Sequence, residues 1–140
     1  MKHLAGTVVW MAALVAGSGS VAADSLEGAD RLLCSPVEVI ACTGDGVCEA
    51  EIPAELGIPP FVVVDLKKKL LSTTAASSEQ RSTPVERVTR ADGLIVLHGQ
   101  ERGRAFTWLM DEASGRVSLA TVRDSVVVNV FGACTPADGR

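Results

Sequence analysis

The sequence has few of the residues that commonly bind transition metals. It contains two histidines and four cysteines in 140 residues, and no pair of cysteines has the CxxC spacing. His98 is the only histidine after residue 23, so the four nitrogen or sulfur ligands of a structural zinc site are not expected. Asp45 lies between two glycines and offers one carboxylate, whereas calcium takes six or more oxygens. We therefore expect no metal and no cofactor.

Positive charge is also scarce. The 13 lysines and arginines are outnumbered by 17 aspartates and glutamates, which gives a net charge of −4. Without Lys2 the balance becomes 12 − 17 = −5. This negative charge disfavours nucleic acids and anionic membrane surfaces as partners. The one basic cluster, Lys67 to Lys69, is explained by a solvated strand end or by an edge protected against aggregation.

A long hydrophobic run is missing as well. After Lys2, the mostly apolar run from Leu4 to Ala16 is about 13 residues long, near 20 Å as a helix, whereas a bilayer core is roughly 30 Å thick. Helix-breaking glycines and serines follow, and then the small residues Val21, Ala22 and Ala23. This pattern is typical of a signal peptide that is cleaved after Ala23. An uncleaved membrane anchor is the alternative.

Cleavage at this site would leave one exported domain. We expect a signal helix over residues 1–23, a lead-in segment over 24–34, a single antiparallel β domain over 35–136 and a C-terminal tail over 137–140. The protein would be delivered to the periplasm or the extracellular space of a bacterium. No membrane span would remain after cleavage.

The four cysteines fit an oxidising compartment, in which an even number predicts two disulfide bonds. Cys42 and Cys48 flank a loop with two glycines, which allow the backbone to reverse, so we pair them across a small loop. By elimination, Cys34 is then joined to Cys134.

Short apolar alternations separated by turn residues predict an all-β fold, an antiparallel meander of about eight strands. The clearest turn is Asp92-Gly93, the dipeptide of a type I′ hairpin. Residues 61–71 are expected to form one strand, residues 72–83 a mobile loop and residues 99–103 a turn. The strand from Ser125 to Phe131 is apolar on both faces, which indicates a central or covered position.

The expected cysteine pairing also bears on how the sheet closes. In an even-stranded up-and-down barrel, the first and last strands are antiparallel neighbours, and Cys34 and Cys134 occupy those strands. The sequence therefore favours a closed or nearly closed small barrel of the calycin type. An open sheet curled around a thin core would permit the same bond.

Three large apolar side chains share one face of the stretch from Arg104 to Met110, namely Phe106, Trp108 and Met110. In a roomy barrel they would line a cavity for an apolar ligand, and in a tight barrel they would form the core.

His98 is the one candidate for a general base, because histidine titrates near neutral pH. A hydrolase would need it beside a nucleophile such as Ser118 or Ser125, yet the GxSxG pattern of a nucleophile elbow is missing. A histidine at the surface end of a strand is the simpler interpretation. Solvent-facing positions explain two pairs of carboxylates, Glu49 with Glu51 and Asp111 with Glu112.

The spacing Cys-x-Pro-x-Glu-Val-x-x-Cys from Cys34 to Cys42, and the ending Phe-Gly-Ala-Cys-Thr-Pro at residues 131–136, resemble a group of uncharacterised exported bacterial proteins. This resemblance implies an envelope location and agrees with the disulfide assignment, and it implies no function. The size, disulfide and expected barrel are also similar to small periplasmic inhibitors of lysozyme. Ser114-Gly115 is the nearest counterpart of that family's inhibitory loop, but the sequence has no tyrosine for the family's second motif.

Three functions are considered on this basis. The first is a non-catalytic exported envelope protein that acts by binding another protein. The second is a lipocalin-like carrier of a small apolar ligand. The third, and the least supported, is a hydrolase that uses His98.

Overall fold

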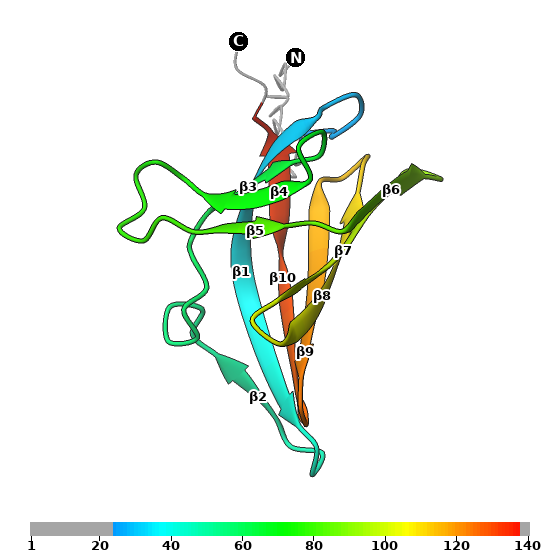
Figure 1. Cartoon of the computed structure of the whole chain (residues 1–140). Coiled ribbons are helices and arrows are strands. Elements are labelled where there is room, and N and C mark those ends of the chain that lie inside the picture. Colours follow the sequence, from blue (N-terminus) through cyan, green and yellow to red (C-terminus); the bar gives the residue numbers. More distant parts are fainter. Residues whose placement is uncertain (1–23, 138–140) are drawn as a thin grey trace, which may run out of the picture.

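The computed structural model describes residues 24–137, which form β-strands and turns without an α-helix (Figure 1). The strands are β1 (Arg31–Thr43), β2 (Cys48–Glu51), β3 (Val62–Asp65), β4 (Leu70–Thr73), β5 (Ser82–Pro84), β6 (Arg87–Ala91), β7 (Leu94–Glu101), β8 (Arg104–Asp111), β9 (Arg116–Arg123) and β10 (Val126–Pro136). The expected signal peptide and the last three residues lie outside the described part of the chain. Residues 24–137 contain no helix with the length and hydrophobicity needed to span a membrane.

All strand pairs are antiparallel, which confirms the expected all-β antiparallel fold. Nine strands follow the order β5-β4-β3-β1-β10-β9-β8-β7-β6, and β2 pairs with β1 beside this path. The sheet curls into a half-barrel, and β1 and β10 run side by side through its middle (Figure 1). The last strand is therefore central, as its two apolar faces predicted.

The barrel is not closed by a strand ladder within residues 24–137. The sheet ends at β5 and β6, which do not pair with each other. The chain passes from Pro84 to Arg87 without a reversing turn, so these consecutive strands cannot become antiparallel neighbours. The link between them extends the ladders on its two sides: the Val85 amide donates to the Lys69 carbonyl beside β4 at 2.8 Å, and the Glu86 amide donates to the His98 carbonyl of β7 at 2.9 Å.

The long strand β1 serves both halves of the sheet. One edge pairs with β10 along most of its length, with an irregularity between Pro36 and Glu38, and the other edge pairs first with β3 and then with β2. Gly132 lies opposite Pro36, and a Cβ atom there would be 2.1 Å from the Ser35 carbonyl oxygen. Only glycine fits this close approach of two backbones.

The core lies on the concave face of the sheet. Its completely buried members include Leu32 in β1, Ile95 and Leu97 in β7, and Met110 in β8. Leu26 also has no exposed surface, so the segment before β1 contributes directly to this core. The expected lead-in thus packs as part of the domain, and the first strand begins at Arg31, earlier than the expected Ser35.

One arginine fastens the N-terminal segment to the far edge of the sheet. The guanidinium of Arg90 in β6 donates to the carbonyls of Ala29 at 3.0 Å and Leu26 at 2.7 Å. It also pairs with the carboxylate of Glu112. The segment's own backbone joins in, because the Leu26 amide donates to the Glu112 carbonyl at 2.7 Å.

The expected single strand over residues 61–71 is wrong. It consists of β3 and β4, which form a hairpin whose reversal contains Lys67, Lys68 and Lys69. Leu66 is the first residue of the turn, and its apolar side chain is buried in the core. Because a buried apolar residue is typical of a strand, the turn is not evident from the sequence here. The lysines are exposed turn residues, and the expected loop over 72–83 is shortened at both ends by β4 and β5.

Two hairpin turns have positive φ angles at both central residues. At the predicted turn, Asp92 and Gly93 have φ angles of 54° and 75°, which agree with type I′. At the next reversal, Arg102 and Gly103 have φ angles of 48° and 75°. The expected turn over 99–103 is therefore too long, because β7 continues to Glu101 and an arginine takes a position usually filled by Asn, Asp or Gly.

Candidate functional site

A cavity of about 390 Å³ lies against the concave face of the sheet. This volume falls within the range of about 300–1,000 Å³ that is usual for small-molecule sites. β8 and β9 supply one wall, and β4 and β5 supply the opposite one. Residues 56–59, from the loop between β2 and β3, form the cover.

The apolar wall consists of Phe106 and Trp108 from β8 and Leu119 from β9. The two aromatic residues are 8% and 6% exposed, so their rings are held by the core and present only a small part of their surface to the cavity. Gly99 lies opposite Phe106, and a Cβ atom at Gly99 would be 2.3 Å from the ring's Cζ. This glycine, expected in a turn, lies within β7 and makes room for the ring.

Met110 is not part of the cavity wall. It follows Phe106 and Trp108 on the same face of β8, as the sequence predicted, but it is completely buried in the core and is not one of the residues that line the cavity. Of the three expected lining residues, two line the cavity.

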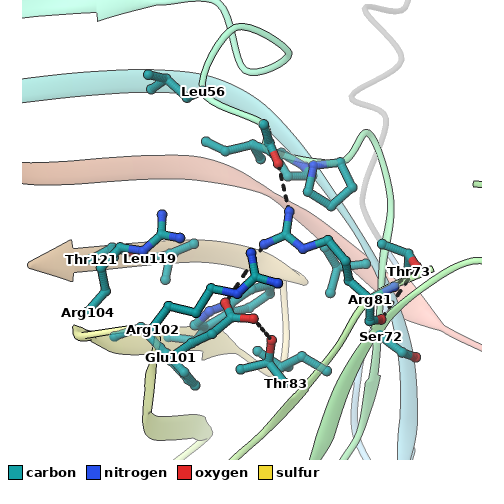
Figure 2. A pocket seen from close by; sticks show the side chains of 18 of the residues that line it. Leu56, Ser72, Thr73, Arg81, Thr83, Glu101, Arg102, Arg104, Leu119 and Thr121 are labelled. Atoms are coloured by element: carbon teal, nitrogen blue, oxygen red, sulfur yellow. Dashed lines mark hydrogen bonds and ion pairs between the residues drawn. The ribbon is translucent and has the colours of Figure 1, made fainter. Parts of the chain in front are cut away.

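A polar cluster connects the cover to the wall (Figure 2). Arg81 donates through Nη1 to the Gly57 carbonyl at 3.0 Å, and its Nη2 is 3.8 Å from Oε2 of Glu101. Glu101 accepts a hydrogen bond from the Thr83 hydroxyl at 2.7 Å. Arg81 also pairs with Glu79 at 3.8 Å. The charge of Arg81 is therefore compensated by two carboxylates.

Two further arginines line the cavity, and they differ from Arg81 in their surroundings. Arg102 comes from the turn between β7 and β8, and Arg104 from the first position of β8. Within residues 24–137, neither forms an ion pair or a side-chain hydrogen bond. Figure 2 shows both guanidinium groups pointing toward the loop that carries Leu56. The cavity thus combines an apolar wall with two uncompensated positive charges.

The structure contains both disulfide bonds expected from the cysteine pattern, Cys34–Cys134 and Cys42–Cys48. The first joins directly opposite residues of β1 and β10, and both of its cysteines are buried. The second closes the exposed hairpin between β1 and β2. Disulfide bonds are typical of proteins that reside in an oxidising, non-cytoplasmic compartment.

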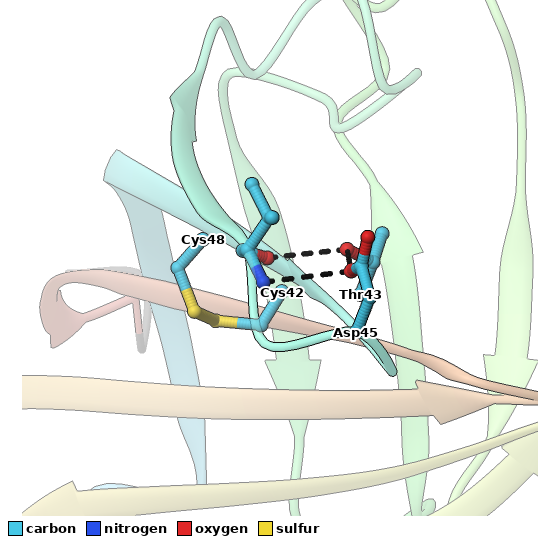
Figure 3. The surroundings of a disulfide bond; sticks show 5 residues. Cys42, Thr43, Asp45 and Cys48 are labelled. Carbon is cyan, nitrogen blue, oxygen red and sulfur yellow. Dashed lines mark hydrogen bonds between the residues drawn. A yellow bond between two sulfur atoms is a disulfide. The ribbon is translucent and has the colours of Figure 1, made fainter.

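Asp45 accepts two hydrogen bonds within the turn of that hairpin (Figure 3). The Thr43 hydroxyl donates to its carboxylate, and the Val47 amide does so at 3.5 Å. These donors, with the hydroxyl as the larger cause, lower the pKa of Asp45 below its ordinary value.

The candidate catalytic histidine lies on the outer face of the sheet. Nδ1 of His98 is 3.0 Å from Oγ1 of Thr107, its partner across β7 and β8. Among the described residues, neither Ser118 nor Ser125 hydrogen-bonds to this ring. A serine nucleophile and its histidine base make such a contact in a hydrolase.

The two pairs of carboxylates that the sequence explains as solvent-facing positions differ in their surroundings. Asp111 accepts hydrogen bonds from the hydroxyl of Ser114 at 2.6 Å and from its amide at 2.7 Å, which lower the pKa of Asp111, whereas Glu112 pairs with Arg90. Ser114 and Gly115 therefore belong to a hydrogen-bonded turn. Glu49 and Glu51 lie on the short strand β2, opposite Ala41 and Val39 of β1.

Comparison of the chain with models of protein families, with curated proteins and with solved structures finds no match.

The cationic part of the site was not predicted from the sequence. Arg104 stands two residues before Phe106 on the same face of β8, so period-two alternation would have placed it beside the predicted lining. Arg81 and Glu101 are far apart in the sequence, and no local pattern connects them.

Proposed function

We propose that this protein is a non-catalytic, exported binding protein that holds a small ligand with an apolar part in the cavity under its curled sheet. The observation that carries the proposal is an apolar wall of Phe106, Trp108 and Leu119 in a partly open cavity of about 390 Å³. Rigid aromatic side chains suit this purpose, because they offer apolar contact without losing much side-chain entropy on binding. Of the two non-catalytic expectations, this geometry favours the carrier.

Export to a bacterial periplasm or to the outside of the cell is part of the same proposal. It is supported by the signal-like pattern of residues 1–23 and by the two disulfide bonds.

The cavity volume sets the size of the ligand. If each non-hydrogen atom takes about the volume of one liquid water, roughly 30 Å³, a cavity of about 390 Å³ holds on the order of a dozen such atoms. A medium alkyl chain with a small polar head has this size, and we choose the decanoate anion and its neutral amide, decanamide, as probes.

The test titrates the oxidised full-length chain with both probes by calorimetry. We expect saturable binding of at least one probe. Binding should also change the tryptophan fluorescence, and this change should not occur in the Trp108→Phe variant. Thr121 lines the cavity from β9, whereas Ser118 lies on the opposite face of the same strand. Thr121→Phe should fill the cavity and abolish binding, and Ser118→Phe should leave it intact. Absence of binding by both probes contradicts the proposal.

Binding to another envelope protein is the second candidate. The observation in its favour is a set of exposed apolar side chains, among them Val37 at 72%, Phe61 at 46% and Phe131 at 42%. Such residues on a surface mark interaction sites when they cluster. The test compares proteins crosslinked to the wild-type chain in its native envelope with those crosslinked to a Phe61→Ser, Phe131→Ser variant of unchanged thermal stability. A partner that is captured equally by both contradicts a role of Phe61 and Phe131 in binding.

A further inference from the structure

We propose that Arg102 and Arg104 recognise an anionic head group, so that the ligand is an amphipathic anion whose apolar chain lies against Phe106 and Trp108. The inference rests on the proposed function, because it assigns the chemical class of the ligand to the same cavity. The shared chemistry is a single carboxylate or phosphate at the end of an alkyl chain.

The charge distribution in the cavity carries the inference. Three arginines and two glutamates line it, which leaves a net positive charge in a chain whose overall charge is −4. Both glutamates are already engaged, since Glu79 and Glu101 each pair with Arg81 at 3.8 Å. Within the described residues, Arg102 and Arg104 therefore have no carboxylate of the protein to compensate them.

The position of the two arginines fits one end of an extended ligand. Arg104 is half-buried and precedes Phe106 and Trp108 on the same face of β8, so a chain lying along these rings has its end at Arg104. Arg102, from the adjoining turn, is exposed to solvent. The guanidinium group donates several hydrogen bonds in a planar fork that matches carboxylate and phosphate oxygens. An anionic head at the solvent end and an apolar tail on the rings satisfy both parts of the cavity.

The closing experiment compares three ligands of equal chain length: decanoate, decyl phosphate and the neutral decanamide. We expect at least one anion to bind about tenfold more tightly than the amide, the size of effect that one charge-assisted hydrogen bond gives. Raising the salt concentration should weaken the binding of the anion and leave the binding of the amide unchanged. A preference for decyl phosphate over decanoate identifies a phosphate head, and the reverse identifies a carboxylate.

Two variants locate the effect. Arg102→Asn removes the guanidinium and places a residue that suits a type I′ turn, so the hairpin is not weakened. Arg104→Gln shortens the side chain and removes its charge. Each should reduce the affinity for the anion several-fold and leave the affinity for decanamide unchanged. The control is Arg87→Gln, the same loss of charge at an exposed position of β6 outside the cavity.

The outcomes separate the two proposals. Equal binding of anions and amide overturns the anion proposal and leaves the cavity-binding function in place. An anion preference that survives in both Arg102→Asn and Arg104→Gln also overturns it. If none of the three ligands binds, the proposed function itself fails. Should Arg104→Gln not fold, Arg102→Asn carries the test.

Discussion

The two disulfide bonds provide a direct test of what holds this sheet together. Replacing Cys34 and Cys134 with alanine removes a crosslink between residues 100 positions apart, whereas replacing Cys42 and Cys48 removes one between residues 6 positions apart. Alanine is chosen because a serine would place an unpaired hydroxyl at the buried positions.

The separations set the expected magnitudes. In the chain-entropy treatment, a crosslink across about 100 residues restricts the unfolded chain by roughly 4.7 kcal/mol, and one across about 6 residues by roughly 2 kcal/mol. The Cys34–Cys134 variant also loses the packing of two buried sulfur atoms in the core, which adds to its loss. We therefore expect it to be less stable than the Cys42–Cys48 variant by at least about 2.5 kcal/mol.

Equilibrium unfolding in urea, followed by circular dichroism, measures this difference. With a slope of about 1–3 kcal/mol per molar urea, the two midpoints should differ by about 1 M or more. The slope itself should rise most in the Cys34–Cys134 variant, because its unfolded chain expands more. Equal midpoints, or a lower midpoint for the Cys42–Cys48 variant, would refute the reasoning from loop length.

Two further predictions concern side chains that fasten turns and edges. Arg90→Ala should lower the free energy of unfolding by about 2–3 kcal/mol, because two carbonyls and Glu112 lose a charged donor, and it should speed hydrogen exchange of the Leu26 amide; the exposed Arg87→Ala should do neither. The pKa of Asp111 is lowered in the folded state, so its hydrogen bonds stabilise the fold above the unfolded value of about 3.9 and are lost as the pH falls through the folded value. The melting temperature of wild type should therefore drop more steeply in acid than that of Asp111→Asn, and parallel curves would show that the turn is not the cause.

The sequence predicted best the local features of the fold, namely which face of a strand is buried and where a tight turn lies. Alternation in β8 identified Phe106, Trp108 and Met110 as side chains of one buried face, because one face of this strand packs on the core and the other does not. Asp92-Gly93 predicted its turn correctly, because few other dipeptides adopt positive φ angles so readily. In the β3–β4 hairpin the same logic failed, since Leu66 is buried and Lys69 adopts a positive φ of 51° without being a glycine.

The pairing of Cys34 with Cys134 was predictable across 100 residues, but most other features that depend on distant parts of the chain were not. Whether the sheet closes is decided by the short link from Pro84 to Arg87, whose direction only the folded sheet determines. The cavity depends on the loop that carries Gly57, held by Arg81 from another hairpin. Arg81 has two glutamate partners, whereas Arg102 and Arg104 have none among the described residues, and this difference depends on where the fold places the glutamates.

The pairing of β1 with β10 in the middle of the sheet has a consequence for how the protein is made. A chain that emerges N-terminus first presents β1 long before its central partner has been synthesised, and the intervening hairpins can form only locally in the meantime. The half holding β3 to β5 and the half holding β6 to β9 are joined mainly by the β1–β10 ladder, so the sheet is complete only when the final strand arrives. Such non-local pairing is slow, because loop closure precedes any gain from the ladder. We expect that removal of residues 126–136 leaves a chain unable to assemble, while the intact chain completes its sheet only after the last residues are released.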